Sequence, residues 1–153
     1  MSKIENAVAW AEQIAADDRH GYSQVHRNSP DYDCSSFVGT ALAKAGFPIS
    51  IYSTTRNLGE QLENAGFVKC GTPWKRGDIH LAAGHHVTMS VDANRIVHAS
   101  RKTAGLMVRR EIRPEKKSVS GRITIFRMKI PFTIGMQEPS TKSRITSWKV
   151  ASR

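Results

Sequence analysis

The hydrophobic pattern changes its period at Gly66, and this change limits the possible folds more than any other feature of the chain. Before Gly66, apolar residues recur at helical spacing in three segments, at about 3–17, 34–45 and 55–65. After it come short strand-like runs separated by turn residues, at 67–70, 78–82, 86–91, 95–99, 106–110 and 122–128. Helices followed by strands predict an α+β domain, in which N-terminal helices pack on a mostly antiparallel sheet of five to six strands.

The predicted helix ends carry their own signals. Ser2 and Glu5 have the spacing of a capping box at the start of the first helix. Asp33 is a good N-cap for the second helix, and Gly46 is a good stop for it. An internal Gly59 weakens the third helix.

The length of 153 residues suits one domain with a substantial core, which we place at 1–130. Residues 131–153 contain two prolines, several Ser and Thr and little periodicity, so we expect a basic, poorly ordered tail. No apolar run approaches the roughly 20 residues that span a bilayer, and the first residues do not resemble a signal peptide. We therefore expect a monomer without a membrane span, which accumulates in the cytoplasm of the producing cell, where its two cysteines stay reduced.

The positive charge lies in the last third of the chain. Residues 1–100 carry 9 Lys/Arg against 10 Asp/Glu, whereas residues 101–153 carry 14 against 3, and the formal net charge is +10. Such asymmetry attracts an anionic partner to one part of a molecule. Nucleic acid, anionic lipid and a polyanionic cell wall would all qualify, and so would the plainer interpretation of a solvated basic face.

Cys34 stands where a polar loop gives way to the second predicted helix. A thiol at a helix start has its thiolate stabilised by the helix dipole and by free N–H groups. A lone cysteine in a small protein is more often a buried hydrophobe, which is how we interpret Cys70 in its strand. The hypothesis that Cys34 is a nucleophile therefore requires a histidine beside it.

The strand at 86–91 supplies that histidine. Its alternation puts His86 and Thr88 on the face opposite the core residues, while His85 faces the core or belongs to the preceding loop. Residues 92–94 suit a three-residue hairpin loop with Asn94 in the left-handed conformation. That register places His98 opposite Thr88 and diagonal to His86, roughly 7–8 Å away between backbone positions. A thiol, an imidazole and a second imidazole that orients the first make a papain-like nucleophilic site.

Four segments resemble the NlpC-like cysteine peptidases, and more closely the phage branch of peptidoglycan amidohydrolases. They are Tyr22-Ser23, Tyr32 to Ser36, Lys75 to Ile79, and His86 through Ser100. The resemblance covers roughly residues 3–128. The twelve-residue intervals from Tyr22 to Cys34 and from His86 to His98 are similar to those of the family. Most cellular members carry Asp-Cys-Ser-Gly, so the Asp-Cys-Ser-Ser sequence here favours the phage branch.

The resemblance implies a papain-like NlpC fold, with Cys34 as nucleophile, His86 as general base and His98 as the residue that orients it. It implies that Tyr22, Ser35 and Asp33 lie near the oxyanion or the substrate, although Asp33 also suits a helix cap better than a catalytic acid. No cofactor is implied.

The reaction implied by the resemblance is hydrolysis of an amide bond in bacterial peptidoglycan. We favour the N-acetylmuramoyl–L-alanine bond over the γ-D-glutamyl (or glutaminyl)–diamino acid bond, a preference that comes from the phage branch and not from any residue here. The expected context is an antimicrobial endolysin that reaches the wall through a membrane lesion. The alternative context is an effector delivered by a secretion machine.

Two other classes of function compete with this hypothesis. Zinc could bind His80, His85, His86 and His98 with a cysteine, but neither HExxH nor paired CxxC spacing is present, and we expect no metal. A non-catalytic module that binds wall or nucleic acid would use the basic part of the chain. Residues 101–129 carry no nucleic-acid motif and no aromatic platform beyond Phe126, so we expect no nucleic-acid partner.

Overall fold

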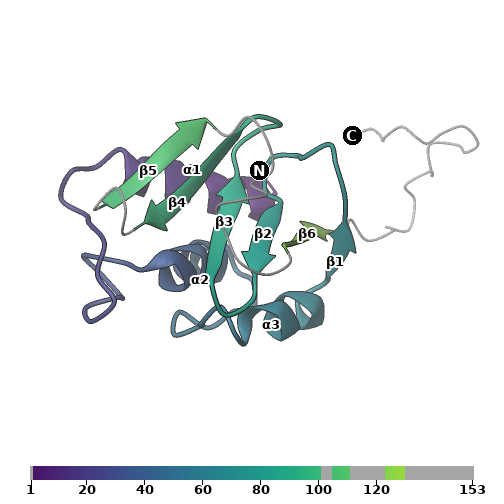
Figure 1. The fold of residues 1–153 in the computed structure, drawn as a ribbon, viewed down its shortest axis with the longest axis horizontal. Helices are drawn as coiled ribbons and strands as arrows, with labels where there is room; N and C mark the ends of the chain where they lie inside the picture. Colours follow the sequence, from purple (N-terminus) through teal and green to yellow (C-terminus); the bar gives the residue numbers. More distant parts are fainter. Residues whose placement is uncertain (1, 101–104, 111–122, 130–153) are drawn as a thin grey trace, which may run out of the picture.

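The computed structural model describes residues 2–100, 105–110 and 123–129, and Figure 1 shows their arrangement. The helices come first, as predicted: α1 (Lys3–Ala15), α2 (Cys34–Lys44) and α3 (Leu58–Asn64). The strands follow: β1 (Phe67–Cys70), β2 (Ile79–Ala82), β3 (His86–Ser90), β4 (Arg95–Ser100), β5 (Gly105–Arg110) and β6 (Thr124–Met128). The α+β class is therefore confirmed, whereas the predicted tail at 131–153 lies outside the described residues.

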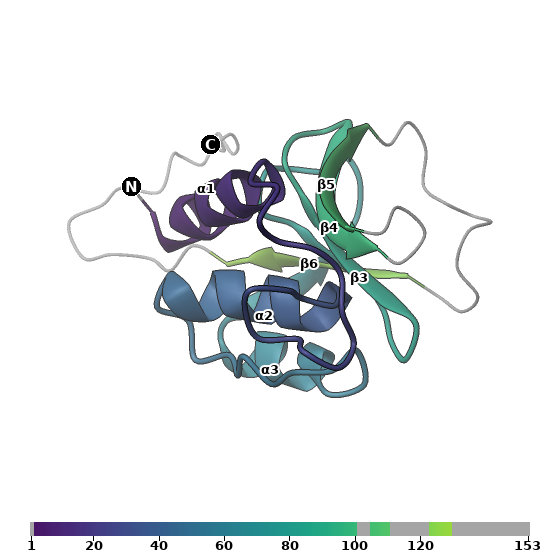
Figure 2. The same cartoon turned by 90° about the vertical axis from the view of Figure 1, so that its left-hand side faces the viewer.

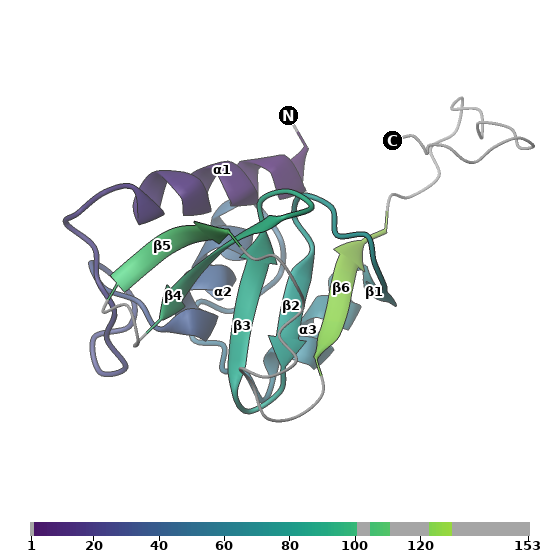
Figure 3. The ribbon, with the colours of Figure 1, turned by 45° about the horizontal axis from the view of Figure 1, so that its top comes forward.

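The six strands form one sheet in the order β1-β6-β2-β3-β4-β5. Each pair of neighbours is antiparallel, in agreement with the prediction. The last strand in the chain, β6, lies between β1 and β2, and Figure 3 shows it beside β2 with β1 beyond it. The sequence pattern did not predict this strand order.

The helices pack on the sheet in an order that follows the strands. The α1 helix contacts β4 and β5, α2 contacts β3 and β4, and α3 contacts β1. Figure 2 shows α2 between α1 and α3, with β3, β4 and β5 on the other side of the molecule. The largest fully buried side chains fill this helix–sheet layer: Phe37, Phe67, Leu42, Leu58, Leu62, Ile79, Met89, Val8, Val38, Val87, Val91 and Val97. Among the described helices, none is long and apolar enough to cross a membrane.

The capping box lies on α2 rather than on α1. The Asp33 carboxylate accepts a hydrogen bond from the Ser36 N–H at 2.9 Å, and the Ser36 hydroxyl accepts one from the Asp33 N–H at 2.9 Å. At α1, Ser2 accepts from the Glu5 N–H at 3.1 Å, but the Glu5 carboxylate binds Arg76 instead of returning to Ser2. The box predicted for α1 is thus half formed, because a charge-assisted pair is stronger than a neutral hydrogen bond.

The third helix begins at Leu58, three residues later than predicted. Before it, the Asn57 side chain accepts a hydrogen bond from the Thr54 N–H at 2.9 Å. This contact closes a turn over residues 54–57, because asparagine side chains commonly replace a backbone acceptor in turns. The helix therefore starts only after the turn.

Residues 75–79, one of the segments that carried the family resemblance, join α1 to the sheet. Arg76 binds Glu5 and Glu12 of α1, each at 2.8 Å. The carboxylate of Asp78, which is 1% exposed, pairs with Arg127 of β6 at 2.7 and 2.8 Å. Between them Gly77 has φ +95°, and a Cβ at this position would overlap the side chain of Ile4. Arg76, Gly77 and Asp78 therefore each have a structural role in joining α1 to the sheet.

Candidate functional site

The β3–β4 hairpin has the predicted three-residue loop. Met89 pairs with Val97 and Ser90 with Ile96, so the loop comprises residues 92–94. The predicted left-handed conformation of Asn94 is wrong, since Ser29 is the one non-glycine residue with positive φ in the described part of the chain. The Asp92 carboxylate accepts the N–H groups of residues 94 and 95 instead, both at 2.8 Å, which stabilises the loop without that conformation.

This register brings His86 and His98 into contact. His86 Nε2 lies 3.0 Å from His98 Nδ1, and the two rings meet edge to face with centroids 5.2 Å apart. His98 is 6% exposed, and burial also lowers the pKa of His86 below its usual value. His85 is exposed in the turn before β3, so it belongs to the loop and not to the core. The hairpin thus presents one histidine held by a second.

The sulfur of Cys34 lies against the strand that carries this pair. Cys34 is the first residue of α2, and the backbone N–H of Val87, the residue after His86, faces the thiol and acts to lower its pKa. The described residues contain no hydrogen bond between the sulfur and the His86 ring, so the two are neighbours through the β3 backbone.

The pKa of the Cys34 thiol is raised, which corrects the expectation of a stabilised thiolate. Burial is the largest cause, and the Asp33 carboxylate acts in the same direction. The N–H groups of Val87, Ser35 and Cys34 itself act against them without prevailing. Desolvation therefore outweighs the helix N-terminus, so the position at a helix start does not by itself favour the thiolate here.

The remaining predicted residues lie around α2. Asp33 is the helix cap, as expected, and it forms an ion pair with Arg27 at 2.9 Å. Ser35 is buried, and its hydroxyl accepts a hydrogen bond from Arg27 at 3.1 Å. Tyr22 is half-buried against the core and forms an isolated backbone bridge with Tyr32. Arg27 was not predicted from the sequence, because an arginine in a polar loop carries no periodic or motif signal.

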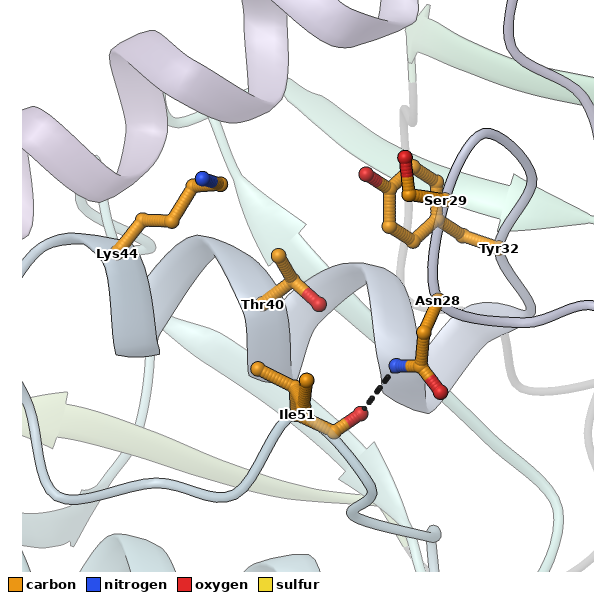
Figure 4. Close-up of a pocket in the computed structure, with 6 residues that line it drawn as sticks. All are labelled: Asn28, Ser29, Tyr32, Thr40, Lys44 and Ile51. Carbon is orange, nitrogen blue, oxygen red and sulfur yellow. Dashed lines mark hydrogen bonds between the residues drawn. The ribbon is translucent and has the colours of Figure 1, made fainter.

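A cavity of about 260 Å³ lies beside α2. It is lined by Asn28, Ser29, Tyr32, Thr40, Lys44 and Ile51, and the Asn28 side chain spans part of it with a hydrogen bond to the Ile51 carbonyl at 2.7 Å (Figure 4). The thiol and the two histidines are not among the lining residues, so the cavity is separate from the candidate site.

The part of the chain that the structure describes contains no cluster of three or more His, Cys, Asp or Glu that could hold a metal ion. The zinc alternative therefore has no ligand set among these residues.

These observations define a class: α+β domains in which a helix start presents a thiol to an antiparallel hairpin with paired histidines. The fold itself is similar to a chain in the crystal structure of the type VI effector–immunity complex Tae3–Tai3 from Ralstonia pickettii. The TM-score is 0.53, with 17% identity, and the match covers 84% of this chain and 100% of that one. At this identity the likeness concerns the fold alone.

Residues 3–130 match the family model of bacteriophage peptidoglycan hydrolases, and the chain belongs to this family. It is also 34% identical, over an alignment of 119 residues that covers 69% of this chain, to the lysin of Pneumococcus phage Dp-1. The chain spans 40% of the length of that curated relative. The resemblance to the phage branch is thus confirmed, while the NlpC-like assignment of the fold stays a prediction.

Proposed function

We propose that the chain is a cysteine-dependent peptidoglycan hydrolase that cleaves an amide bond of the wall peptide. The observation that carries this proposal is the contact of 3.0 Å between His86 Nε2 and His98 Nδ1, on the strand whose Val87 N–H meets the Cys34 sulfur. Membership of the phage peptidoglycan hydrolase family supports the substrate class.

His86 acts as the general base in the first half of the reaction. If its Nε2–H donates to His98 Nδ1, the lone pair of His86 lies on Nδ1 and can take the thiol proton. The sulfur then attacks the amide carbon, and a tetrahedral intermediate forms. The imidazolium of His86 returns the proton to the leaving nitrogen, and a thioester with Cys34 remains.

Water completes the reaction. His86 Nδ1 takes a proton from the water while the oxygen attacks the thioester, and the thiol is released with that proton. In both halves the intermediate oxygen carries negative charge, and the N–H groups at the start of α2 are suited to stabilise it. The raised pKa of the thiol and the lowered pKa of His86 favour this general-base route over a preformed thiolate–imidazolium pair.

His98 holds the His86 ring in the tautomer that the reaction requires. A histidine whose second nitrogen is hydrogen-bonded has a fixed orientation and a defined site for the proton. Tyr22 and Ser35 stay candidates for contacts with the oxyanion or the substrate, and Asp33 contributes as the cap of α2.

The bond that is cleaved is part of the proposal. We favour the N-acetylmuramoyl–L-alanine amide, and the alternative is the γ-D-glutamyl (or glutaminyl)–diamino acid bond. Mass spectrometry of digested walls distinguishes the two, because the first cleavage leaves free lactyl ends on muramic acid and the second releases new diamino-acid amines.

The mechanism is tested by comparing two cysteines. Cys34→Ala is expected to abolish wall lysis and keep wall binding, whereas Cys70→Ala, at a half-buried strand position, keeps both. Lysis that survives Cys34→Ala but not a chelator would favour metal catalysis instead. Binding to walls or to DNA without any lysis in the parent chain would favour a non-catalytic basic module.

The basic residues after position 100 support a second part of the proposal. Bacterial walls carry phosphate-rich polymers, and a positively charged segment raises the local concentration of enzyme at such a surface. Adsorption to walls is therefore expected to weaken from low to physiological salt, where the Debye length is about 8 Å. We also propose that the protein is synthesised in the host cytoplasm and acts at the bacterial cell wall.

A further inference from the structure

Arg27 binds the first turn of the helix that carries the candidate nucleophile. Its Nε donates to Asp33 Oδ2 at 2.9 Å and its Nη2 donates to Asp33 Oδ1 at 3.2 Å, which makes the ion pair bidentate. The same Nη2 donates to the Ser35 hydroxyl at 3.1 Å. Cys34 lies between these two partners in the chain, so one guanidinium holds the residues on both sides of it.

The same guanidinium also binds the loop that follows α2. Nη2 donates to the Ser53 carbonyl at 2.5 Å and Nη1 to the Tyr52 carbonyl at 3.5 Å. This loop is itself fixed, because the buried Ser53 hydroxyl donates to the Ser50 carbonyl at 2.6 Å. That carbonyl would lie 2.8 Å from a Cβ at Gly39, so the loop packs tightly on α2.

The arrangement has a geometric and an electrostatic consequence for the sulfur. Geometrically, Arg27 joins the loop before α2, the helix start and the loop after α2, and its side chain is only 20% exposed. Electrostatically, it neutralises the Asp33 carboxylate, which is 13% exposed and whose charge acts against ionisation of the neighbouring thiol. A planar, bidentate guanidinium suits both purposes, and a lysine could not reproduce the pairing.

We propose that Arg27 is a positioning residue, which fixes the sulfur of Cys34 at the start of α2 and shields it from the Asp33 carboxylate. The inference rests on the proposed function for its catalytic meaning, but its effect on the thiol can be measured without turnover. The hydrogen bonds and the ion pair that the structure gives for Arg27 go to the helix start and the following loop, so we infer that it acts through the helix start.

The experiment measures alkylation of Cys34 by iodoacetamide against pH, in the full chain with Cys70→Ser. We expect Arg27→Met to move the inflection of the profile to higher pH and to slow alkylation at moderately alkaline pH by about tenfold, which corresponds to roughly one pKa unit. Arg19→Met is the matched control, since Arg19 is 85% exposed and pairs with Asp17 away from α2. It is expected to leave the profile unchanged.

If Arg27 only stabilises the fold, Arg27→Met is expected to speed alkylation, because a looser fold would expose the Cys34 thiol. An inflection of Arg27→Met that stays in place or moves to lower pH would therefore overturn the proposal. If Arg27→Met does not fold, Arg27→Lys keeps the charge and loses the bidentate pair. We then expect an unchanged inflection with at least a tenfold loss of kcat/KM in wall digestion, and unchanged kcat/KM would overturn the proposal.

The outcomes for Arg27 and for the proposed function can be told apart. Lysis that survives Cys34→Ala would refute the cysteine mechanism. The alkylation profile of Arg27→Met would still report whether Arg27 controls the thiol. The two failures therefore leave different signatures.

Discussion

Replacing His80 with glutamine tests how far one buried, uncharged histidine limits the stability of the fold in acid. His80 lies on β2 and is 8% exposed. Its Nε2 is 2.6 Å from the Ser90 hydroxyl, and the Trp74 ring covers it edge-on with centroids 4.3 Å apart. Burial lowers the pKa of His80 to about 4, although the nearby Asp78 carboxylate acts in the opposite direction.

The magnitude follows from proton linkage. In the unfolded chain a histidine has a pKa of about 6.5, whereas His80 in the folded state has a pKa of about 4. Between these two pH values the unfolded state binds a proton at this residue and the folded state does not. The contribution of His80 to the free energy of unfolding is therefore present above about pH 6.5 and is lost as the pH falls. Between about pH 7 and pH 5 the loss is about 2 kcal/mol, and it reaches about 3 kcal/mol near pH 4.

Urea denaturation at a series of pH values measures this loss. His80→Gln can still donate to Ser90, so we expect a constant packing penalty and an unfolding free energy that falls less steeply in acid than that of the parent. The difference between the two proteins should shrink by about 2 kcal/mol from about pH 7 to pH 5. His85→Gln, at an exposed turn position, is the control. A parent–variant difference that is independent of pH would refute the reasoning.

Three further changes test the packing around the site, each by urea denaturation at neutral pH. Arg127→Met leaves the buried Asp78 carboxylate without its partner and should cost about 3–5 kcal/mol, so a loss under about 1 kcal/mol would contradict the assigned pair. Gly77→Ala forces a side chain into a positive-φ position that overlaps Ile4, and a cost of at least about 2 kcal/mol is expected. Phe37→Ala empties the fully buried centre of α2 and should cost about 3–5 kcal/mol; a smaller loss would mean that the cavity collapses.

Local sequence signals correctly predicted the helix cap and the hairpin register, because both depend on residues that are close together in the chain. Asp33 capped α2 as expected, because its partner Ser36 is three residues away and the geometry is nearly independent of the rest of the fold. The register of the β3–β4 hairpin was also correct, because loop length and strand alternation fix it. The contact between His86 and His98 followed from that register alone.

The same local signals did not predict contacts between residues that are far apart in the sequence. Arg27 binds partners 6, 8 and 26 residues away, and nothing in its polar loop distinguishes it from a solvated arginine. Glu5 was assigned to a local capping box, but Arg76, 71 residues later, binds it instead. The pKa of Cys34 depends on burial by the sheet, so the position at a helix start predicted the wrong direction for it.

The place of β6 between β1 and β2 has a consequence for the newly made protein. The helices and the β2–β3–β4 strands can associate while the chain is still growing, yet the two strands that flank β6 wait for residues 124–128. Until then β1 and β2 each have a row of unpaired backbone N–H and C=O groups. Unpaired strand edges of this kind promote aggregation of partly folded chains. Pairing of β6 with β1 and β2 covers these two rows and completes the six-stranded order.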